Sequence, residues 1–371
     1  MKEHATAARP TDNRSRLRVR RVCKWLTISV VLIVAAGALF QLSVTKWESY
    51  RYPPPGKLMD AGGLRLHINC TGAGSPAVIM DSGLGDTSVI WQLVQPEISK
   101  LSRVCSYDRA GLGWSDAPNE PRTSLNIANE LDRLLTRAMV PGPYILVGSS
   151  FGGYNIRVFA SRHRNQVVGI VFLDAAHPDQ LNRPPFGING QLKPEYQRMI
   201  SNYYKLMIWT VPLGVPRILG WCRDDYTFPD QPAALAAAWA RFVPEATALD
   251  CRLRSFRTQW AESREFASSG RIASTAGPFG DIPLVVLSHD PEMSGGNFFS
   301  PADAAMAERV WAELQEELRG LSSRSKRIVA KGSRHCVQCY RPELVVAAVQ
   351  EIVNDVRGIR PFRAEAETEY K

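Results

Sequence analysis

Beyond its first 24 residues, the chain lacks the excess positive charge that is typical of nucleic-acid binding. The net charge of the 371-residue chain is +9, but residues 1–24 hold eight Lys or Arg against only Glu3 and Asp12. The rest of the chain therefore carries only +3. A body so nearly balanced in charge argues against a nucleic-acid partner.

The sequence also lacks a second C-x-x-C pair to accompany Cys336 and Cys339, which argues against a zinc site. Cys23 lies beside an apolar segment, and the other cysteines are Cys70, Cys105, Cys222, Cys251, Cys336 and Cys339. Six cysteines are compatible with three disulfides in an oxidising compartment, without fixing which residues pair. A redox role for Cys336 and Cys339 is the alternative.

Charged residues are absent between Lys24 and Lys46. The apolar run from Trp25 to Val44 is long enough to cross a bilayer, which takes about 20 residues. Its basic flank predicts a cytoplasmic N-terminus and an exported body. Ala36 and Ala38 offer the small residues of a signal-peptide cleavage site, so secretion after cleavage is the alternative. We favour an uncleaved anchor, because the basic region is long and the apolar run is full length.

Short apolar runs alternate with helical patterns in the body, which predicts an α/β fold with a mostly parallel sheet covered by helices on both faces. The alternation breaks between residues 178 and 276, where the sequence is rich in Pro, Trp and Arg and mostly helical in pattern. We therefore expect the following organisation: 1–24 basic tail, 25–45 anchor, 46–56 Pro-rich linker, 57–177 first part of the core, 178–276 helical lid, 277–358 second part of the core, 359–371 polar tail.

The strongest chemical signal is a G-x-S-x-G pattern around Ser150. It follows the apolar run from Tyr144 to Val147 and precedes a helical segment, Tyr154 to Arg162. Strand, tight turn and helix form the context of a nucleophile elbow, in which small neighbours permit a strained central residue. We expect the hydroxyl of Ser150 to face a crevice as a nucleophile.

A serine nucleophile needs a base, and the base needs an orienting carboxylate. His335 follows the expected strand from Arg327 to Ala330 and comes late in the chain, as the order Ser, acid, His requires. Two acids compete for the third role. We favour Asp290, just after a strand that ends at Leu287, and Asp174 is the alternative.

A tetrahedral oxyanion needs hydrogen-bond donors. Phe151, directly after the nucleophile, would supply one backbone N–H. The other would come from the loop after Met80, where Gly83 and Gly85 allow close approach. We favour the N–H of Leu84, with that of Gly83 next.

Together these motifs resemble the α/β-hydrolase-fold serine hydrolases, in the branch with a lid after the sixth strand. The stretches that carry the resemblance are Asp81 to Asp86, Tyr107 to Asp116, Val147 to Gly153, Ser288 to Pro291, and His335. The resemblance implies that the second strand lies beside the fourth, which would bring Cys70 near Cys105. Two departures, Ser149 before the nucleophile and Ser82 before Gly83, replace His residues common in the family. They leave the reacting groups in place.

The resemblance implies a hydrolase that cleaves small carboxylic esters and needs no metal or organic cofactor. The N-terminal segment adds the expectation that it is membrane-anchored and exported, and the tryptophans of the expected lid favour an ester with an apolar acyl or alcohol group. Its relatives with an Asp nucleophile, dehalogenases and epoxide hydrolases, are disfavoured by Ser150. An aminopeptidase or amidase on the same triad is the second hypothesis, with Glu245 or Glu262 holding a substrate ammonium. The third hypothesis is a catalytically silent binding protein that keeps the fold.

Overall fold

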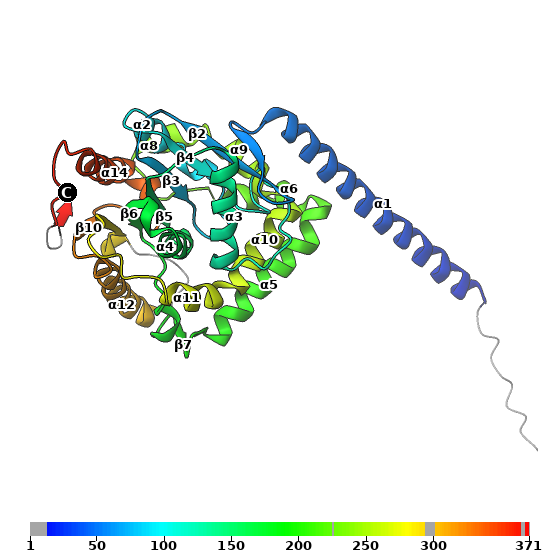
Figure 1. The fold of residues 1–371 in the computed structure, drawn as a ribbon. Helices are drawn as coiled ribbons and strands as arrows, with labels where there is room; N and C mark the ends of the chain where they lie inside the picture. Colours follow the sequence, from blue (N-terminus) through cyan, green and yellow to red (C-terminus); the bar gives the residue numbers. More distant parts are fainter. Residues whose placement is uncertain (1–12, 225, 294–300, 365–367, 371) are drawn as a thin grey trace, which may run out of the picture.

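A nine-stranded sheet forms the centre of the computed structural model, which describes residues 13–224, 226–293, 301–364 and 368–370 (Figure 1). The strand order is β1-β2-β4-β3-β5-β6-β9-β10-β11. Pairing is antiparallel from β1 to β2 and from β2 to β4, and parallel elsewhere. The strands are β1 (Lys57–Asp60), β2 (Arg65–Thr71), β3 (Ala77–Asp81), β4 (Val104–Tyr107), β5 (Tyr144–Ser149), β6 (Val167–Leu173), β9 (Leu284–His289), β10 (Ser325–Ala330) and β11 (Thr368–Tyr370). The predicted mostly parallel sheet is confirmed.

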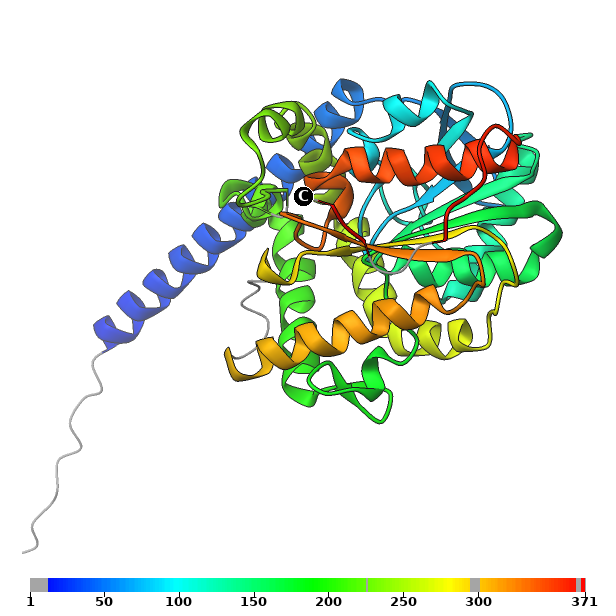
Figure 2. The ribbon, with the colours of Figure 1, turned by 90° about the vertical axis from the view of Figure 1, so that its left-hand side faces the viewer.

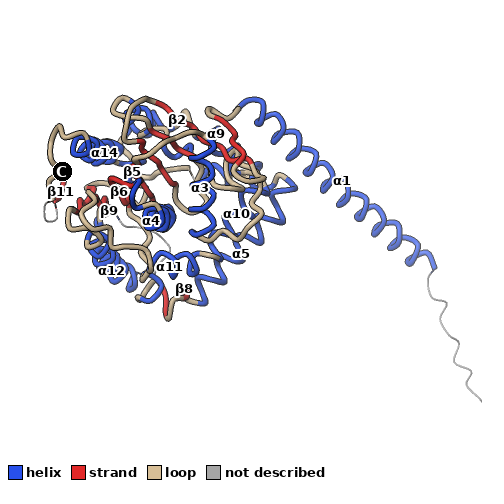
Figure 3. The backbone as a smooth tube through the Cα atoms, in the orientation of Figure 1, coloured by secondary structure: helices blue, strands red, loops and turns tan. Residues whose placement is uncertain are grey.

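Helices cover both faces of this sheet, because its central strands are apolar on both sides (Figure 3). One hydrophobic core lies under α3 (Ser124–Arg137), α4 (Gly152–Arg162) and α11 (Phe266–Ser274). The other lies under α2 (Gln95–Ser99), α13 (Val337–Tyr340) and α14 (Pro342–Val356). The helix α12 (Pro301–Arg319) packs on β9 and β10. The fold class predicted from the sequence is therefore confirmed.

The chain between β6 and β9 forms a helical insertion. Its elements are β7 (Gly187–Ile188), β8 (Gln191–Leu192), α5 (Pro194–Thr210), η4 (Val211–Leu213), α6 (Val215–Ile218), α7 (Trp221–Asp224), α8 (Ala233–Trp239), α9 (Val243–Asp250), α10 (Leu253–Arg264) and α11. It has a small core of its own, where Tyr204, Met207 and Phe256 pack around the Cys222–Cys251 disulfide.

The N-terminal helix α1 (Asn13–Arg51) is long and apolar enough to cross a membrane. Its first half stands clear of the body, and its second half packs against the insertion (Figures 1 and 2). There Gln41 donates to the carbonyl of Cys251, and Glu48 pairs with Arg217. The helix continues into the first part of the expected linker, because residues 45–51 contain no Pro or Gly and Glu48 is fixed by that ion pair.

Three disulfides join the six cysteines of the body. Cys70 and Cys105 face each other in the β2–β4 register, so the pairing implied by the family resemblance is confirmed. Cys336 and Cys339 are also joined, and their sulfurs are therefore not free thiolates that could bind zinc.

Candidate active site

Ser150 occupies a strained turn between β5 and α4. Its φ is +49°, in the left-handed region that non-glycine residues rarely adopt. The turn is possible because the residues two positions before and after Ser150 are glycines. A Cβ on Gly148 would lie 2.7 Å from Ile156 Cδ1, and one on Gly152 would lie 2.4 Å from the carbonyl oxygen of Asp81. Ser150 is partly exposed, whereas the residues on either side of it are buried.

His335, on the loop after β10, contacts Asp174 rather than Asp290. Its Nδ1 lies 2.5 Å from Asp174 Oδ2, and its side chain is 59% exposed. Asp290 instead accepts the backbone N–H of Gly332 at 2.8 Å and of Glu292 at 3.1 Å, so it fixes the turn that leads to His335. The preference for Asp290 as the partner of His335 is corrected: the alternative acid, Asp174, makes that contact.

Asp174 is a buried carboxylate at the end of β6, and its own φ is +43°. Besides His335, it accepts hydrogen bonds from Trp311 Nε1 at 2.7 Å and from the backbone N–H of His289 at 3.1 Å. Burial by itself would raise the pKa of Asp174, but the charge of His289 and the hydrogen bonds from both histidines outweigh burial and hold that pKa well below its usual range.

His289 also belongs to this group, although its place in the sequence indicated only a turn or pocket-wall residue. Its Nδ1 lies 2.9 Å from Asp174 Oδ2, and its Nε2 lies 2.8 Å from Glu308 Oε2. Burial would lower the pKa of His289, yet the charge of Asp174 and the hydrogen bonds to both carboxylates outweigh it and raise the pKa to about 10. The available signal was topological: β6 and β9 are neighbours, so residues at their carboxyl ends meet.

The loop after β3, which carries Leu84, lies directly beside Ser150. A Cβ on Gly83 would lie 3.5 Å from Ser150 Cβ and 2.5 Å from Asp86 Oδ2. Phe151, the other expected amide donor, is buried at the start of α4. The structure thus brings together both segments that were expected to supply oxyanion donors.

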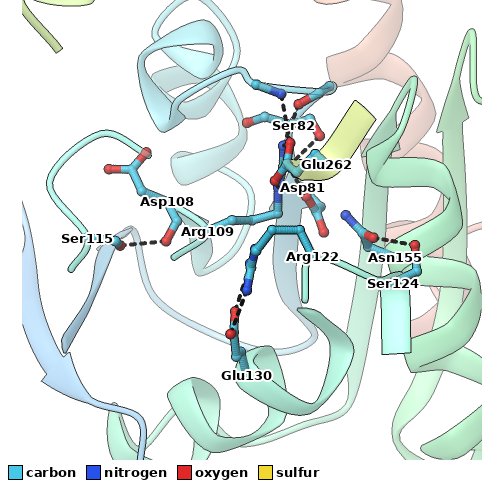
Figure 4. A network of polar contacts seen from close by, with 12 residues as sticks. Asp81, Ser82, Asp108, Arg109, Ser115, Arg122, Ser124, Glu130, Asn155 and Glu262 are labelled. Atoms are coloured by element: carbon cyan, nitrogen blue, oxygen red, sulfur yellow. Dashed lines mark hydrogen bonds and ion pairs between the residues drawn. The ribbon is translucent and has the colours of Figure 1, made fainter. Parts of the chain in front are cut away.

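A buried guanidinium holds this loop in place (Figure 4). Arg109 donates to Asp81 Oδ1 at 2.7 Å and to the carbonyl oxygens of Ser82 and Gly83 at 2.7 and 2.6 Å. It also donates to Glu262 Oε1 on α10 at 2.7 Å. Because Glu262 is fully buried and also accepts the N–H of Gly85, it is not free to hold a substrate ammonium.

A second contact ties the nucleophile turn to the loop of His335. Ser149 and Gln338 exchange hydrogen bonds at 3.2 and 3.3 Å. Gln338 lies between the two cysteines of the Cys336–Cys339 disulfide, which directly follows His335. Ser149 thus occupies the position of the histidine common in the family and uses its hydroxyl to join two parts of the site.

A cavity of about 740 Å³ lies between Leu84 and the insertion. Apolar side chains form much of its wall, from Leu84, Leu181, Phe186, Leu192, Ile200, Trp260 and Phe266. Of the lining residues that the structure describes, the charged ones are Arg198, Lys205 and Arg264, all basic. Glu245, the other carboxylate suggested for an ammonium, is not among the lining residues; it lies near Asp108 and His67.

Within the part of the chain that the structure describes, no three His, Cys, Asp or Glu side chains are grouped so that they could hold a metal ion. The groups gathered around Ser150 and His335 are a hydroxyl, two imidazoles, the carboxylates of Asp174 and Glu308, and backbone amides.

The chain belongs to the alpha/beta hydrolase family, whose model matches residues 78–348. It is 26% identical to a probable transporter, efuK, of Hormonema carpetanum over 325 residues, which are 82% of this chain and 43% of that protein. The chain thus spans less than half the length of that relative.

Solved structures share the fold. An epoxide hydrolase, CorEH, matches with a TM-score of 0.57 and 18% identity, covering 81% of this chain and 98% of the other. A thermophilic esterase from Thermogutta terrifontis matches with a TM-score of 0.54 and 19% identity, covering 81% and 97%. At this identity, the likeness concerns the fold and not the substrate.

Proposed function

We propose that the protein is a serine hydrolase that cleaves carboxylic esters through an acyl-enzyme. Ser150 attacks the ester carbonyl, His335 takes the proton of the hydroxyl and passes it to the leaving alcohol, and Asp174 orients His335. The observation that carries the proposal is the 2.5 Å contact between His335, after β10, and Asp174, after β6, together with the strained turn at Ser150.

The backbone N–H groups of Leu84 and Phe151 stabilise the oxyanion in this mechanism. Support comes from the close approach of the loop after β3 to Ser150 and from the Arg109 network that holds its carbonyl oxygens. A fixed loop matters because preorganised donors need no rearrangement as charge develops on the carbonyl oxygen.

The helical insertion acts as the lid of this enzyme and forms the substrate cavity with Leu84. The apolar part of the cavity wall favours an ester with an apolar acyl or alcohol group. An aminopeptidase is less well supported, because Glu262 is bound to Arg109 and none of the described residues that line the cavity is a carboxylate. Ser150 at the nucleophile position likewise favours an esterase over an epoxide hydrolase.

The helix α1 anchors the enzyme in a membrane, with residues 1–24 in the cytoplasm and the body exported. Secretion after cleavage near Ala38 is the alternative. The contact of Gly37 with Leu213 favours the intact anchor, because cleavage near Ala38 would separate Gly37 from the body. The N-terminal sequence of the protein recovered from membranes distinguishes the two.

A fluorophosphonate probe tests the catalytic proposal. Wild-type protein should be labelled, and Ser150→Ala should not. Ser149→Ala is the matched control, since it removes the adjacent hydroxyl, and it should remain labelled although more slowly. Equal labelling of wild type and Ser150→Ala, or none of either in folded protein, would contradict the proposal.

A further inference from the structure

If α1 spans a bilayer, its packing against the insertion determines how deep in that bilayer the contacting part of the insertion lies. A Cβ on Gly37 would lie 2.5 Å from the carbonyl oxygen of Leu213, and a Cβ on Gly214 would lie 2.6 Å from Phe40 Cδ1. Gly37 and Phe40 belong to the apolar run that ends at Val44. At 1.5 Å per residue, they lie about 10 and about 6 Å inside that end along the helix axis.

The turn at Leu213 and Gly214 is therefore brought to the level of the acyl chains by its contact with α1. Helices that lie on a bilayer bury an apolar face to about this depth, roughly 5–10 Å. Tilt of α1 would reduce the depth but would not lift the turn out of the interface, since both residues touch the apolar run.

The surface around this turn has the composition of a membrane-inserted face. Trp209 at the end of α5 is 78% exposed and Ile218 at the end of α6 is 67% exposed; Leu219 and Trp221 beside them are exposed too. Exposed Met199, Tyr203 and Leu206 continue the apolar row along α5 at intervals of three or four residues. We call this set of residues the apolar lid face.

The direction of α5 suits such an orientation. In both Figure 1 and Figure 2, α5 runs across the direction of α1 rather than along it. A bilayer crossed by α1 would thus lie alongside α5, so that the whole apolar row can reach the interface. The sheet and α14 lie on the far side of the insertion from the free half of α1.

The charges bordering this face favour an anionic surface. Arg198, Lys205 and Arg223 are exposed, and the structure shows no ion pair for them among the described residues. Between positions 193 and 225 the sequence holds five Lys or Arg against Glu195, Asp224 and Asp225. Basic side chains around a buried apolar face attract the headgroups of anionic lipids.

We propose that the apolar lid face is inserted in the outer leaflet of an anionic bilayer, and that the cavity beside α5 takes its ester from a lipid of that membrane. The second part rests on the proposed serine hydrolase function. Ile200, Ser201 and Lys205 of α5 line the same cavity as Leu84, so one helix borders both the bilayer and the oxyanion loop.

The reaction on such a lipid is an ordinary ester hydrolysis. A bond forms between Ser150 Oγ and the acyl carbon, the bond from that carbon to the lipid alcohol breaks, and the serine proton reaches the alcohol through His335. Water then adds to the acyl-enzyme and releases a fatty acid and the free hydroxyl. The apolar wall of the cavity can accept the acyl chain.

Fluorophore labelling of the full chain in vesicles tests insertion without relying on activity. In a Cys23→Ser background, which removes the free thiol outside the three disulfides, an environment-sensitive dye is attached to Trp209→Cys, Leu219→Cys, Leu32→Cys and Ile359→Cys. The vesicles contain phosphatidylcholine and phosphatidylglycerol, with a nitroxide on the acyl chains as quencher. Leu32 lies in the apolar run, and Ile359 is 67% exposed after α14.

Dyes at 209, 219 and 32 should be quenched, and the dye at 359 should not. The proposal is overturned if positions 209 and 219 behave like 359 while 32 is quenched, because α1 is then inserted and the face is not. It is equally overturned if 32 is not quenched, since the depth argument then fails.

The proposal of a lipid substrate is tested by placing a charge on the apolar lid face. Leu219→Glu should lower hydrolysis of a diacylglycerol ester in these vesicles at least about tenfold, because a charge at this depth opposes insertion. Hydrolysis of p-nitrophenyl butyrate should stay within about twofold of wild type. Ile359→Glu is the matched control and should change neither rate. If the wild-type protein hydrolyses neither ester, the hydrolase function is contradicted, while the quenching result still decides whether the face is inserted. If Leu219→Glu loses activity equally on both esters, the proposal of a lipid substrate is overturned.

Discussion

Replacing Asp174 by Asn should nearly abolish turnover, whereas the same change at Asp290 should not. In the wild-type protein, His335 Nδ1 lies 2.5 Å from a carboxylate oxygen of Asp174. In Asp174→Asn, an amide takes the place of that carboxylate. The NH₂ group of the amide would favour the tautomer with its proton on Nε2, and that nitrogen could not accept the serine proton. The analogous change in a Ser-His-Asp triad costs about 10⁴ in kcat. We expect a loss of about 10³–10⁴, or about 4–5.5 kcal/mol of transition-state stabilisation.

Asp290→Asn is the matched variant, because it makes the same substitution at the other aspartate that follows a strand near His335. Among the described residues, its carboxylate accepts the backbone N–H groups of Gly332 and Glu292 and lies 3.6 Å from the ammonium of Lys331. The amide oxygen can still accept one of these bonds, so the turn before His335 loosens without losing a reacting group. We expect kcat/KM to fall by less than about tenfold, since one hydrogen bond of this kind contributes about 1 kcal/mol.

The assay is kcat/KM for p-nitrophenyl butyrate, with fluorophosphonate labelling as a second readout. Near-UV circular dichroism of each variant shows whether it is folded, because Asp174→Asn also weakens the contacts to Trp311 and His289. The reasoning is refuted if folded Asp174→Asn keeps most of its activity, or if Asp290→Asn loses as much as Asp174→Asn.

Three further changes address the groups around the proposed triad. The pKa of His289 is raised from 6.5 to about 10 in the folded protein, so its protonated form stabilises the fold fully below pH 6.5 and this contribution is lost as the pH rises through about 10. His289→Asn should therefore lower the free energy of unfolding in urea more at about pH 6 than at about pH 11. Arg109→Lys cannot keep all of the bonds to Asp81, Glu262 and the loop after β3; it should cost about 3–5 kcal/mol in urea unfolding, and retention of wild-type stability would contradict the buried network. Burial raises the pKa of Asp86 to about 6 against the opposing charges of Arg109 and His335, so above this pH a negative charge lies beside Ser150. Asp86→Asn should raise kcat/KM several-fold above about pH 6 and leave it little changed below; a pH profile that matches the wild type would refute this.

The parts of the fold that rest on continuous apolar runs could be predicted from the sequence. The strands β3 and β6 coincide with the runs that begin at Ala77 and Val167, because nothing but burial is needed there. The start of β10 was predicted at Arg327 but lies at Ser325. Lys326 is buried in the strand with its ammonium paired to Glu351, and a paired buried charge cannot be distinguished from a surface charge in the sequence.

In the candidate site, too, some residues could be predicted from the sequence and others could not. Ser150 could be recognised because the glycine spacing is a local requirement of the turn. The partner of His335 could not, since Asp174 and Asp290 both follow strands and chain order favours the later one. Their difference is a matter of direction: Asp290 is turned toward the backbone N–H groups of Glu292 and Gly332, and Asp174 toward His335.

The position of Asp174 explains why two imidazoles and a second carboxylate accompany it. An acid at the end of β6 is separated from the loop of β10 by β9, so His289 at the end of β9 necessarily lies beside the carboxylate that His335 reaches. A protonated His289 alone would neutralise Asp174 and weaken its stabilisation of an imidazolium at His335. Glu308, 2.8 Å from His289 Nε2, restores a net charge of −1 to the group before reaction. Proton transfer to His335 then takes the group from −1 to zero, as in a triad with one isolated aspartate. In the proposed mechanism, Glu308 therefore compensates for the position of the acid after β6 instead of after β9, because it offsets the charge of the intervening His289.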